Sequence, residues 1–374
     1  MSAIVAFWLL AALVCSAPFL PAIIEWIART DAQPLVVVRE QDTNIRHFAL
    51  GFCDRVQDLL EREGIDADNP PADHQGEYRP GERFRVLGAS SPPSWPAATQ
   101  RSRVVDVMLV ALRDLLLEGG FVYAQEVYAR GQIVAGSNAT YRALYGGTDV
   151  LLGDGCTVAR WLHSQGHVHI GADCTVYGRV SSGLSMTLGA GTRFERLNAP
   201  LIRFASDGAV RGPAAALGSR RTPWPDAEAT AALHALDERT LRAAGDLVLP
   251  TQCAVRNHLV ARGNLLIGAG SRVDGNLKAR EQLVSGAGSV LRGAVVCRGA
   301  VVLGEGCLVK GPVISESEVV VAAGCVVGTP AMPTTITAPR IHVAAGSQVS
   351  GTIWATEHGL VETATADTQT LANA

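Results

Sequence analysis

The chain of 374 residues has almost no lysine and few aromatic side chains. Lys278 and Lys310 are the only lysines, aromatic residues make up 5% of the sequence, and the formal net charge is −3. Proteins that bind nucleic acid usually carry a basic stripe with interleaved aromatic residues, so we expect no nucleic-acid partner. The low aromatic content suits a slender core made of valine, leucine and small residues.

The sequence also lacks the short motifs of common enzymes. It contains no Walker phosphate loop, no Gly-x-Ser-x-Gly elbow and no nucleotide-binding βαβ pattern. No Cys-x-x-Cys pair or Cys–His spacing of a zinc site occurs. We therefore expect no cofactor, no metal and no catalytic residue, and interpret the chain as a non-enzyme.

A repeat of 18 residues is the strongest positive signal. Six glycines fall on this beat, in two groups of three: Gly153, Gly171, Gly189, Gly268, Gly286 and Gly304. Short alternating apolar segments precede each of them, which is typical of brief strands with one face inward. A fixed short period of this kind indicates a solenoid. The sequence thus predicts an all-β β-helix (β-solenoid) with 18-residue coils, in which these glycines are structural coil corners.

Most cysteines share one position of the coil. They stand three residues after a corner, where serine or threonine also occurs: Cys156, Cys174, Cys253, Cys307 and Cys325. Such a position requires a small buried side chain, which free cysteine provides. Cys307 and Cys325, in adjacent coils, would lie close enough to oxidise, so free thiols weakly favour a reducing compartment.

The repeat divides the chain into two solenoid segments, residues 104–211 and 246–356. Residues 212–245 interrupt the beat and are expected to form a loop and a helix from Ala227 to Ala244. The spacing permits the coils to resume in register after this excursion, forming one rod, and two separate solenoids are the alternative. A smaller insertion is expected in the coil at 329–340, and 357–374 is expected to be a disordered tail.

Three regions precede the solenoid. Residues 1–30 include one charged residue before Arg29, namely Glu25, and predict an N-terminal transmembrane helix, with a cleaved signal peptide as the rival. Residues 31–64 form a juxtamembrane region whose amphipathic helix spans Thr43 to Gly64, and 65–103 is predicted to be a Pro-rich linker. Arginines on the C-terminal flank of the anchor favour a cytoplasmic solenoid at a bacterial inner membrane, with the periplasm as the alternative.

Three histidines are the best candidates for a polar site. His163, His167 and His169 lie within one predicted coil, and alternation places His167 and His169 on the outer face. No carboxylate or cysteine close in sequence accompanies them as a further metal ligand. A solvated outer face is therefore the favoured interpretation.

The repeat pattern resembles that of bactofilins, the polymer-forming cytoskeletal proteins of bacteria. The resemblance rests on the stretch from Gly268 to Gly293, with Val309-Lys-Gly311 and Val349-Ser-Gly-Thr-Ile353, and extends over Leu247 to Trp354. It implies a right-handed triangular β-helix that self-assembles without nucleotide beneath the membrane. It also implies a scaffold for envelope or polysaccharide-synthesis proteins, so the expected partners are the membrane, further copies of the chain and an unidentified protein of that kind.

Two other function classes remain open. A left-handed hexapeptide-repeat acyltransferase also has 18 residues per coil, and His163 or His167 would then be its base. A non-catalytic envelope adhesin or binding solenoid is the third class. Within the scaffold class, the N-terminal region either leaves the rod free to form filaments or caps one end.

Overall fold

The computed structural model describes residues 5, 8, 44–71, 73–88, 93–205, 222–223 and 233–362. The chain divides into two compact units, Met1–Asn44 and Ile45–Ala374, and the second contains all the strands that the structure describes. The predicted anchor at 1–30 lies outside the described residues except for Val5 and Trp8, which are helical. Among the helices that the structure describes, none has the length and apolar character needed to span a membrane.

The second unit is an all-β solenoid of about 13 turns. Its first stack of coils contains β3 (Val104–Val105), β4 (Met108–Ala111), β5 (Leu115–Leu117), β6 (Val122–Ala129), β7 (Ile133–Ala135), β8 (Thr140–Gly146), β9 (Val150–Leu152), β10 (Thr157–Ser164), β11 (His167–Ile170), β12 (Thr175–Ser182), β13 (Ser185–Leu188) and β14 (Arg193–Phe204). Each strand pairs in parallel with the equivalent strand of the next coil, as in the pairing of Val150 with Val168.

The second stack comprises the strands from β15 onward, most of which are two to four residues long. It contains β15 (Thr222–Pro223), β16 (Leu233–Ala235), β17 (Thr240–Ala243), β18 (Leu247–Leu249), β19 (Cys253–Val255), β20 (His258–Ala261), β21 (Leu265–Ile267), β22 (Arg272–Val273), β23 (Leu277–Ala279), β24 (Leu283–Ser285), β25 (Val290–Leu291), β26 (Val295–Cys297), β27 (Val301–Leu303), β28 (Leu308–Val309), β29 (Val313–Ser315), β30 (Glu318–Val321), β31 (Val326–Val327), β32 (Thr334–Ala344) and β33 (Gln348–Glu362). Here Leu265 pairs with Leu283 and Leu283 with Val301, so the 18-residue columns of the sequence lie in register.

The repeated glycines lie at the turns between strands, and close packing between coils explains them. A Cβ atom added to Gly286 would lie 2.5 Å from the amide nitrogen of Ala269 in the preceding coil, and one added to Gly189 would lie 2.7 Å from that of Ala172. The left-handed backbone angle occurs two residues later, as at Gly288. The first glycine of each turn, such as Gly286, therefore leaves room for the backbone of the preceding coil. The residue two positions later, such as Gly288, has the left-handed conformation.

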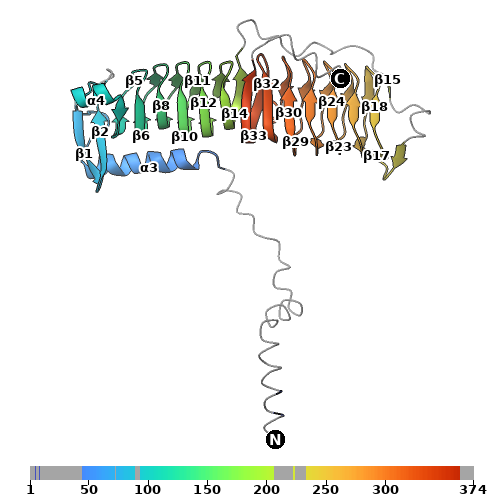
Figure 1. Ribbon diagram of the computed structural model, residues 1–374, viewed down its shortest axis with the longest axis horizontal. Coiled ribbons are helices and arrows are strands. Elements are labelled where there is room, and N and C mark those ends of the chain that lie inside the picture. Colours follow the sequence, from blue (N-terminus) through green and yellow to red (C-terminus); the bar gives the residue numbers. More distant parts are fainter. Residues whose placement is uncertain are drawn as a thin grey trace. The chain divides into compact units, whose positions relative to one another are not determined.

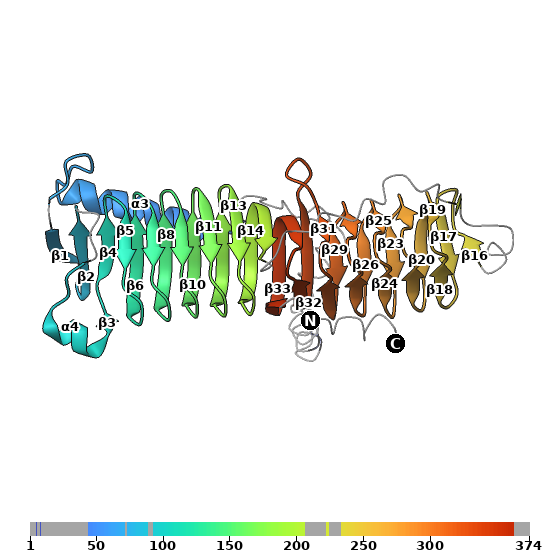
Figure 2. The same cartoon turned by 90° about the horizontal axis from the view of Figure 1, so that it is seen from above.

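The two stacks run in opposite directions and meet at their C-terminal ends. The last strand of the first stack, β14, pairs antiparallel with the last strand of the second, β33, and Leu197 lies opposite Ile353. Figure 2 shows both stacks leading from the ends of the rod to this central joint. Of the two alternatives left open by the sequence, the structure has two solenoids, because β18 pairs with β21 and the coils do not resume from the first stack. One rod forms, from two opposed solenoids.

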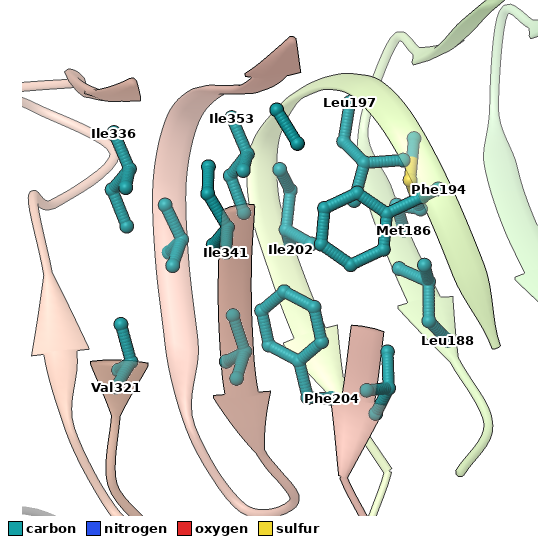
Figure 3. Packing of buried hydrophobic residues seen from close by; sticks show 14 of the residues in the cluster. Met186, Leu188, Phe194, Leu197, Ile202, Phe204, Val321, Ile336, Ile341 and Ile353 are labelled. Carbon is teal, nitrogen blue, oxygen red and sulfur yellow. The ribbon is translucent and has the colours of Figure 1, made fainter. Parts of the chain in front are cut away.

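Aromatic packing closes the joint. Figure 3 shows the rings of Phe194 and Phe204 among aliphatic side chains of both stacks, including Ile202 and Ile353. A Cβ atom at position 359 would overlap the Phe194 ring, so Gly359 permits this ring to lie against β33. One hydrophobic cluster therefore continues from the first stack into the second.

The amphipathic helix is found as α3, His47–Arg62, and it covers part of the first stack. Its buried face consists of Ala49, Phe52, Val56, Leu59 and Leu60. Figure 1 shows α3 along one side of the rod, where these residues form a satellite cluster with strand residues. The helix ends before Gly64, which has the left-handed φ of +67°.

Three boundary predictions are wrong. The predicted linker at 65–103 contains a hairpin of β1 (Asp73–Arg79) and β2 (Glu82–Leu87), followed by α4 (Ala97–Ser102), because Phe84 and Val86 are buried against the first stack. The described part of the predicted helix at 227–244 forms β16 and β17, because ladder pairing with β20 overrides its alanine-rich helical propensity. The tail predicted from 357 begins later, since β33 continues to Glu362; residues 363–374 lie outside the described part.

Candidate functional site

His163, a candidate for the solvated outer face, is on the outer side of β10 but is not solvated. Only 3% of its surface is exposed, because it lies beside Tyr145 in the region that α3 covers. Its Nδ1 atom is 2.8 Å from the Ser181 hydroxyl. Burial, with a smaller effect from the charge of Arg46, lowers the pKa of His163 to about 4. The imidazole is therefore neutral near pH 7 and acts as a packed, hydrogen-bonded residue.

The other two candidate histidines are exposed on β11. The Nδ1 atom of His167 is 2.8 Å from the Ser185 hydroxyl of the next coil, and His169 points outward two residues later. Within the described residues, no group of three potential ligands is arranged to hold a metal ion. The structure brings His167 and His169 to one face and separates them from the buried His163.

The cysteine column is an internal feature of the core. Cys156, Cys174, Cys253, Cys307 and Cys325 are all buried free thiols. The Sγ of Cys325 donates to the carbonyl of Gly304 at 3.1 Å, and Cys174 makes the equivalent bond to Gly153 at 3.3 Å. The hydrogen bond with Cys307 and burial together raise the pKa of Cys325 well above its usual range. The same hydrogen bond lowers the pKa of Cys307 to about 7, so it is burial in the core that shields these thiols from reagents.

A cleft of about 640 Å³ lies between α3 and the strands it covers. Its walls combine aromatic residues, among them Phe48 and Tyr177, with arginines and two glutamates. Tyr177 is 51% exposed and Phe48 is exposed as well. A concave surface that is both aromatic and charged is the kind of place where ligands bind.

Both glutamates of the cleft already have partners. Glu126 accepts from Arg142 at 3.2 Å and lies 3.5 Å from Arg55. Glu195 accepts the backbone N–H of Gly178 at 2.8 Å. The charge of Glu126 is therefore paired with arginines, whereas the Glu195 carboxylate is held by a backbone amide.

Beside the cleft, four side chains form what we call the Trp–Arg column. Strand pairing aligns Trp161 of β10 with Arg179 of β12, Arg179 with Arg196 of β14, and Arg196 with Trp354 of β33. The column therefore crosses the joint between the stacks. The guanidinium carbon of Arg196 lies 4.2 Å from the centre of the Trp354 ring, and that of Arg179 lies 4.8 Å from the Phe48 ring.

Only part of this column could be found from the sequence. Trp161 and Arg179 are 18 residues apart, so the repeat already aligns them. A register shift between Val176 and Arg179 moves the next member to Arg196, 17 residues on. Trp354 joins from the other stack through the antiparallel joint, which no periodicity in the sequence predicts.

The two ends of the rod differ in how they are covered. At the end of the first stack, β1 pairs antiparallel with β2 and presents an edge that carries Asp73, Glu77 and Arg79. At the other end, β18 has one strand partner, β21, among the residues that the structure describes. A charged edge opposes strand addition, and an edge without a partner permits it.

Comparison with known proteins adds no relative. No family model, no curated protein and no solved structure matches this chain.

Proposed function

We propose that the protein is a non-catalytic, bactofilin-like scaffold that associates with itself through the ends of its solenoid and organises envelope or polysaccharide-synthesis proteins. The observation that carries this proposal is the central joint. Two solenoids in one chain already meet end to end there, through an antiparallel strand pair and a shared core. The joint is therefore an example, within one chain, of the end-to-end contact that we propose between two copies of the chain.

The free end for association is the one at β18. The amide of Leu247 donates to Asn264 at 2.8 Å, and the carbonyl of Leu249 accepts from Gly268 at 2.9 Å, so both face the next coil. Because neighbouring residues of a strand direct their backbone groups to opposite sides, Val248 directs its N–H and C=O away from the rod. Val248 is also 61% exposed. No described residue pairs with this side of β18, and here we propose that a second copy pairs.

The hairpin at the other end limits this assembly. The polar edge strand β1 and helix α3 occupy the end and side of the first stack. Association through the β18 end alone gives a two-copy rod, because each copy then offers one open end. We therefore propose a small, end-to-end oligomer in preference to an open filament.

Mass measurement and electron microscopy of the full chain in mild detergent test this proposal. We expect rods of twice the single-copy length that become single on Val248→Pro, since proline removes the outward N–H. Val248→Ala keeps that N–H and should keep the double rods. A wild-type chain that stays single at its highest soluble concentration overturns the proposal.

We further propose that residues 1–30 anchor the protein in a bacterial inner membrane, with the solenoid in the cytoplasm. The support comes from the sequence alone, through the long apolar stretch and the arginines that follow it. A phosphatase fused after Ala374 should be inactive in living cells, because that enzyme needs the oxidising periplasm. An active fusion would place the solenoid on the other side.

One observation favours a second candidate function, that of a binding solenoid. The Trp–Arg column and its cleft form a polar and aromatic surface that end-to-end assembly does not use. No comparable observation favours the acyltransferase. Of its two candidate bases, His163 is buried and His167 is exposed on β11, and neither lines the cleft or the smaller cavity beside Arg142.

A further inference from the structure

The Trp–Arg column contains an electrostatic conflict within the protein. Arg179 and Arg196 lie directly opposite each other on neighbouring parallel strands, whose spacing is about 4.8 Å. Like charges in this position destabilise a sheet. Among the described residues, no carboxylate forms an ion pair with either of them, nor with Arg160, which is exposed in the wall of the cleft. Within the described part of the chain, these three neighbouring guanidinium groups therefore lack an ion-pair partner.

The geometry of these arginines suits an external anion. Rings hold two of them in place, because Arg179 packs over Phe48 and Arg196 over Trp354. A guanidinium that is fixed in this way loses little freedom when it binds a carboxylate by two parallel hydrogen bonds. Of the nearby glutamates, Glu126 is held by Arg55 and Arg142, and Glu195 accepts the Gly178 amide and forms no ion pair with these arginines.

The aromatic residues indicate what else the ligand carries. Trp354 is 40% exposed and Tyr177 is half exposed, whereas Trp161 is nearly covered. A sugar ring has a face of C–H groups that packs against such aromatic surfaces. Successive coils thus present arginines, which can bind carboxylates, and aromatic rings, which can pack against sugar faces. This arrangement matches a chain of acidic sugars.

Two rival polyanions fit less well. A nucleic acid carries a phosphate at every residue and binds through many phosphate contacts, whereas the column offers three arginines in a chain of formal net charge −3. Glu126 and Glu195, in the wall of the cleft, can accept hydrogen bonds from sugar hydroxyls. A lipid surface cannot follow the cleft, because α3 forms one of its walls.

We propose that the cleft beside α3 and the Trp–Arg column together bind a segment of an acidic, carboxylate-bearing polysaccharide. The ligand lies across the coils, with its carboxylates on Arg160, Arg179 and Arg196 and a sugar ring on Trp354. Because the column crosses the joint, both stacks contribute to the site. Binding of this kind does not depend on end-to-end assembly of the rods.

The test is calorimetric titration of the full chain with short oligomers of galacturonate and of mannuronate. A neutral galactose oligomer and a single-stranded thymidine oligonucleotide serve as comparison ligands. We expect at least one uronate oligomer to bind, more weakly at high salt because screening weakens the ion pairs. Failure of both uronates to bind, or equal binding of the neutral oligomer, overturns the proposal. Tighter binding of the oligonucleotide also overturns it and reassigns the surface to nucleic acid.

Variants locate the site. Arg179→Gln with Arg196→Gln should weaken uronate binding by about tenfold or more, since a charge-assisted hydrogen bond contributes roughly that factor. Arg298→Gln, which alters an exposed arginine paired with Glu316 in the second stack, should leave binding unchanged. The double variant should melt at the same or a higher temperature than wild type, because it relieves repulsion. Unchanged uronate affinity in the double variant overturns the assignment to this column.

Discussion

His163 offers a direct test of how α3 covers the first stack. The side chain is buried beneath the helix, and its hydrogen-bond partner among the described residues is the Ser181 hydroxyl. We expect His163→Asn to abolish most of the loss of stability that the wild-type protein suffers between neutral and mildly acidic pH. Asparagine keeps a hydrogen-bonding group for Ser181 and has no proton to gain in this range.

The magnitude follows from the pKa. Burial lowers the pKa of His163 from 6.5 to about 4, and each unit corresponds to about 1.4 kcal/mol, so the full effect is about 3 kcal/mol. The unfolded chain binds this proton more tightly than the folded one. The contribution to stability is therefore complete above the unfolded pKa and is lost as pH falls from about 6.5 to about 4.

Urea unfolding of the full chain at several pH values in this window measures the effect. The difference in unfolding free energy between wild type and His163→Asn should shrink by about 2 to 3 kcal/mol from the upper to the lower end. His169→Gln, which alters an exposed histidine on β11, should follow the wild-type curve. If the wild-type and His163→Asn curves run parallel, the histidine is not buried in the neutral form and the reasoning fails.

Three further predictions concern packing. Gly286→Ala should destabilise the protein by about 1 to 3 kcal/mol in urea unfolding, because its new methyl group would meet the backbone of Ala269. Gly51→Ala, on an open face of α3, should stabilise the protein by about 0.5 to 1 kcal/mol, and equal effects of the two substitutions would contradict this account of the corners. Phe52→Ala should cost about 3 to 5 kcal/mol, because the ring packs on Trp161 beneath α3, and a loss below 1 kcal/mol would mean that the helix is not docked. Cys53, which is partly exposed, should react with a thiol reagent in the native state while the cysteine column reacts only on unfolding, and fast reaction of the column would show that the core opens.

The coil itself could be predicted from the sequence because its determinants are local. A corner such as Gly286 repeats every 18 residues, and the residues before it alternate between core and surface. The structure keeps that register, with Leu283 aligned to Leu265 and Val301. The burial of the cysteine column follows from the same repeat, since equal positions of successive coils stack on each other.

The hairpin of β1 and β2 could not be predicted in this way. Its strands lie in a region rich in proline and polar residues, and its stability comes from Phe84 and Val86 packing on the satellite cluster. The region from 233 to 244 shows the same limit, because its composition favours a helix in isolation while the end of the second stack offers a ladder to pair with. Contacts far away in the sequence decided both cases.

In the site, too, the repeat determines some features and contacts between distant segments determine the others. The sequence made His163 a candidate for the outer face, but only the docking of α3 buried it and lowered its pKa. Trp161 and Arg179 share a position in the repeat, whereas Arg196 and Trp354 join them through a register shift and the joint.

The sequence by itself determined a β-solenoid of 18-residue coils, its corners, its narrow core and the amphipathic helix, because each depends on periodic residue types a few positions apart. Only the tertiary structure decided that the two stacks oppose each other, that their last strands pair antiparallel, and that arginines from adjacent coils lie between two tryptophans. The physical reason is that either direction of stacking satisfies the same repeat. The choice between them depends on how β14 and β33, far apart in the sequence, complete each other's hydrogen bonds and core.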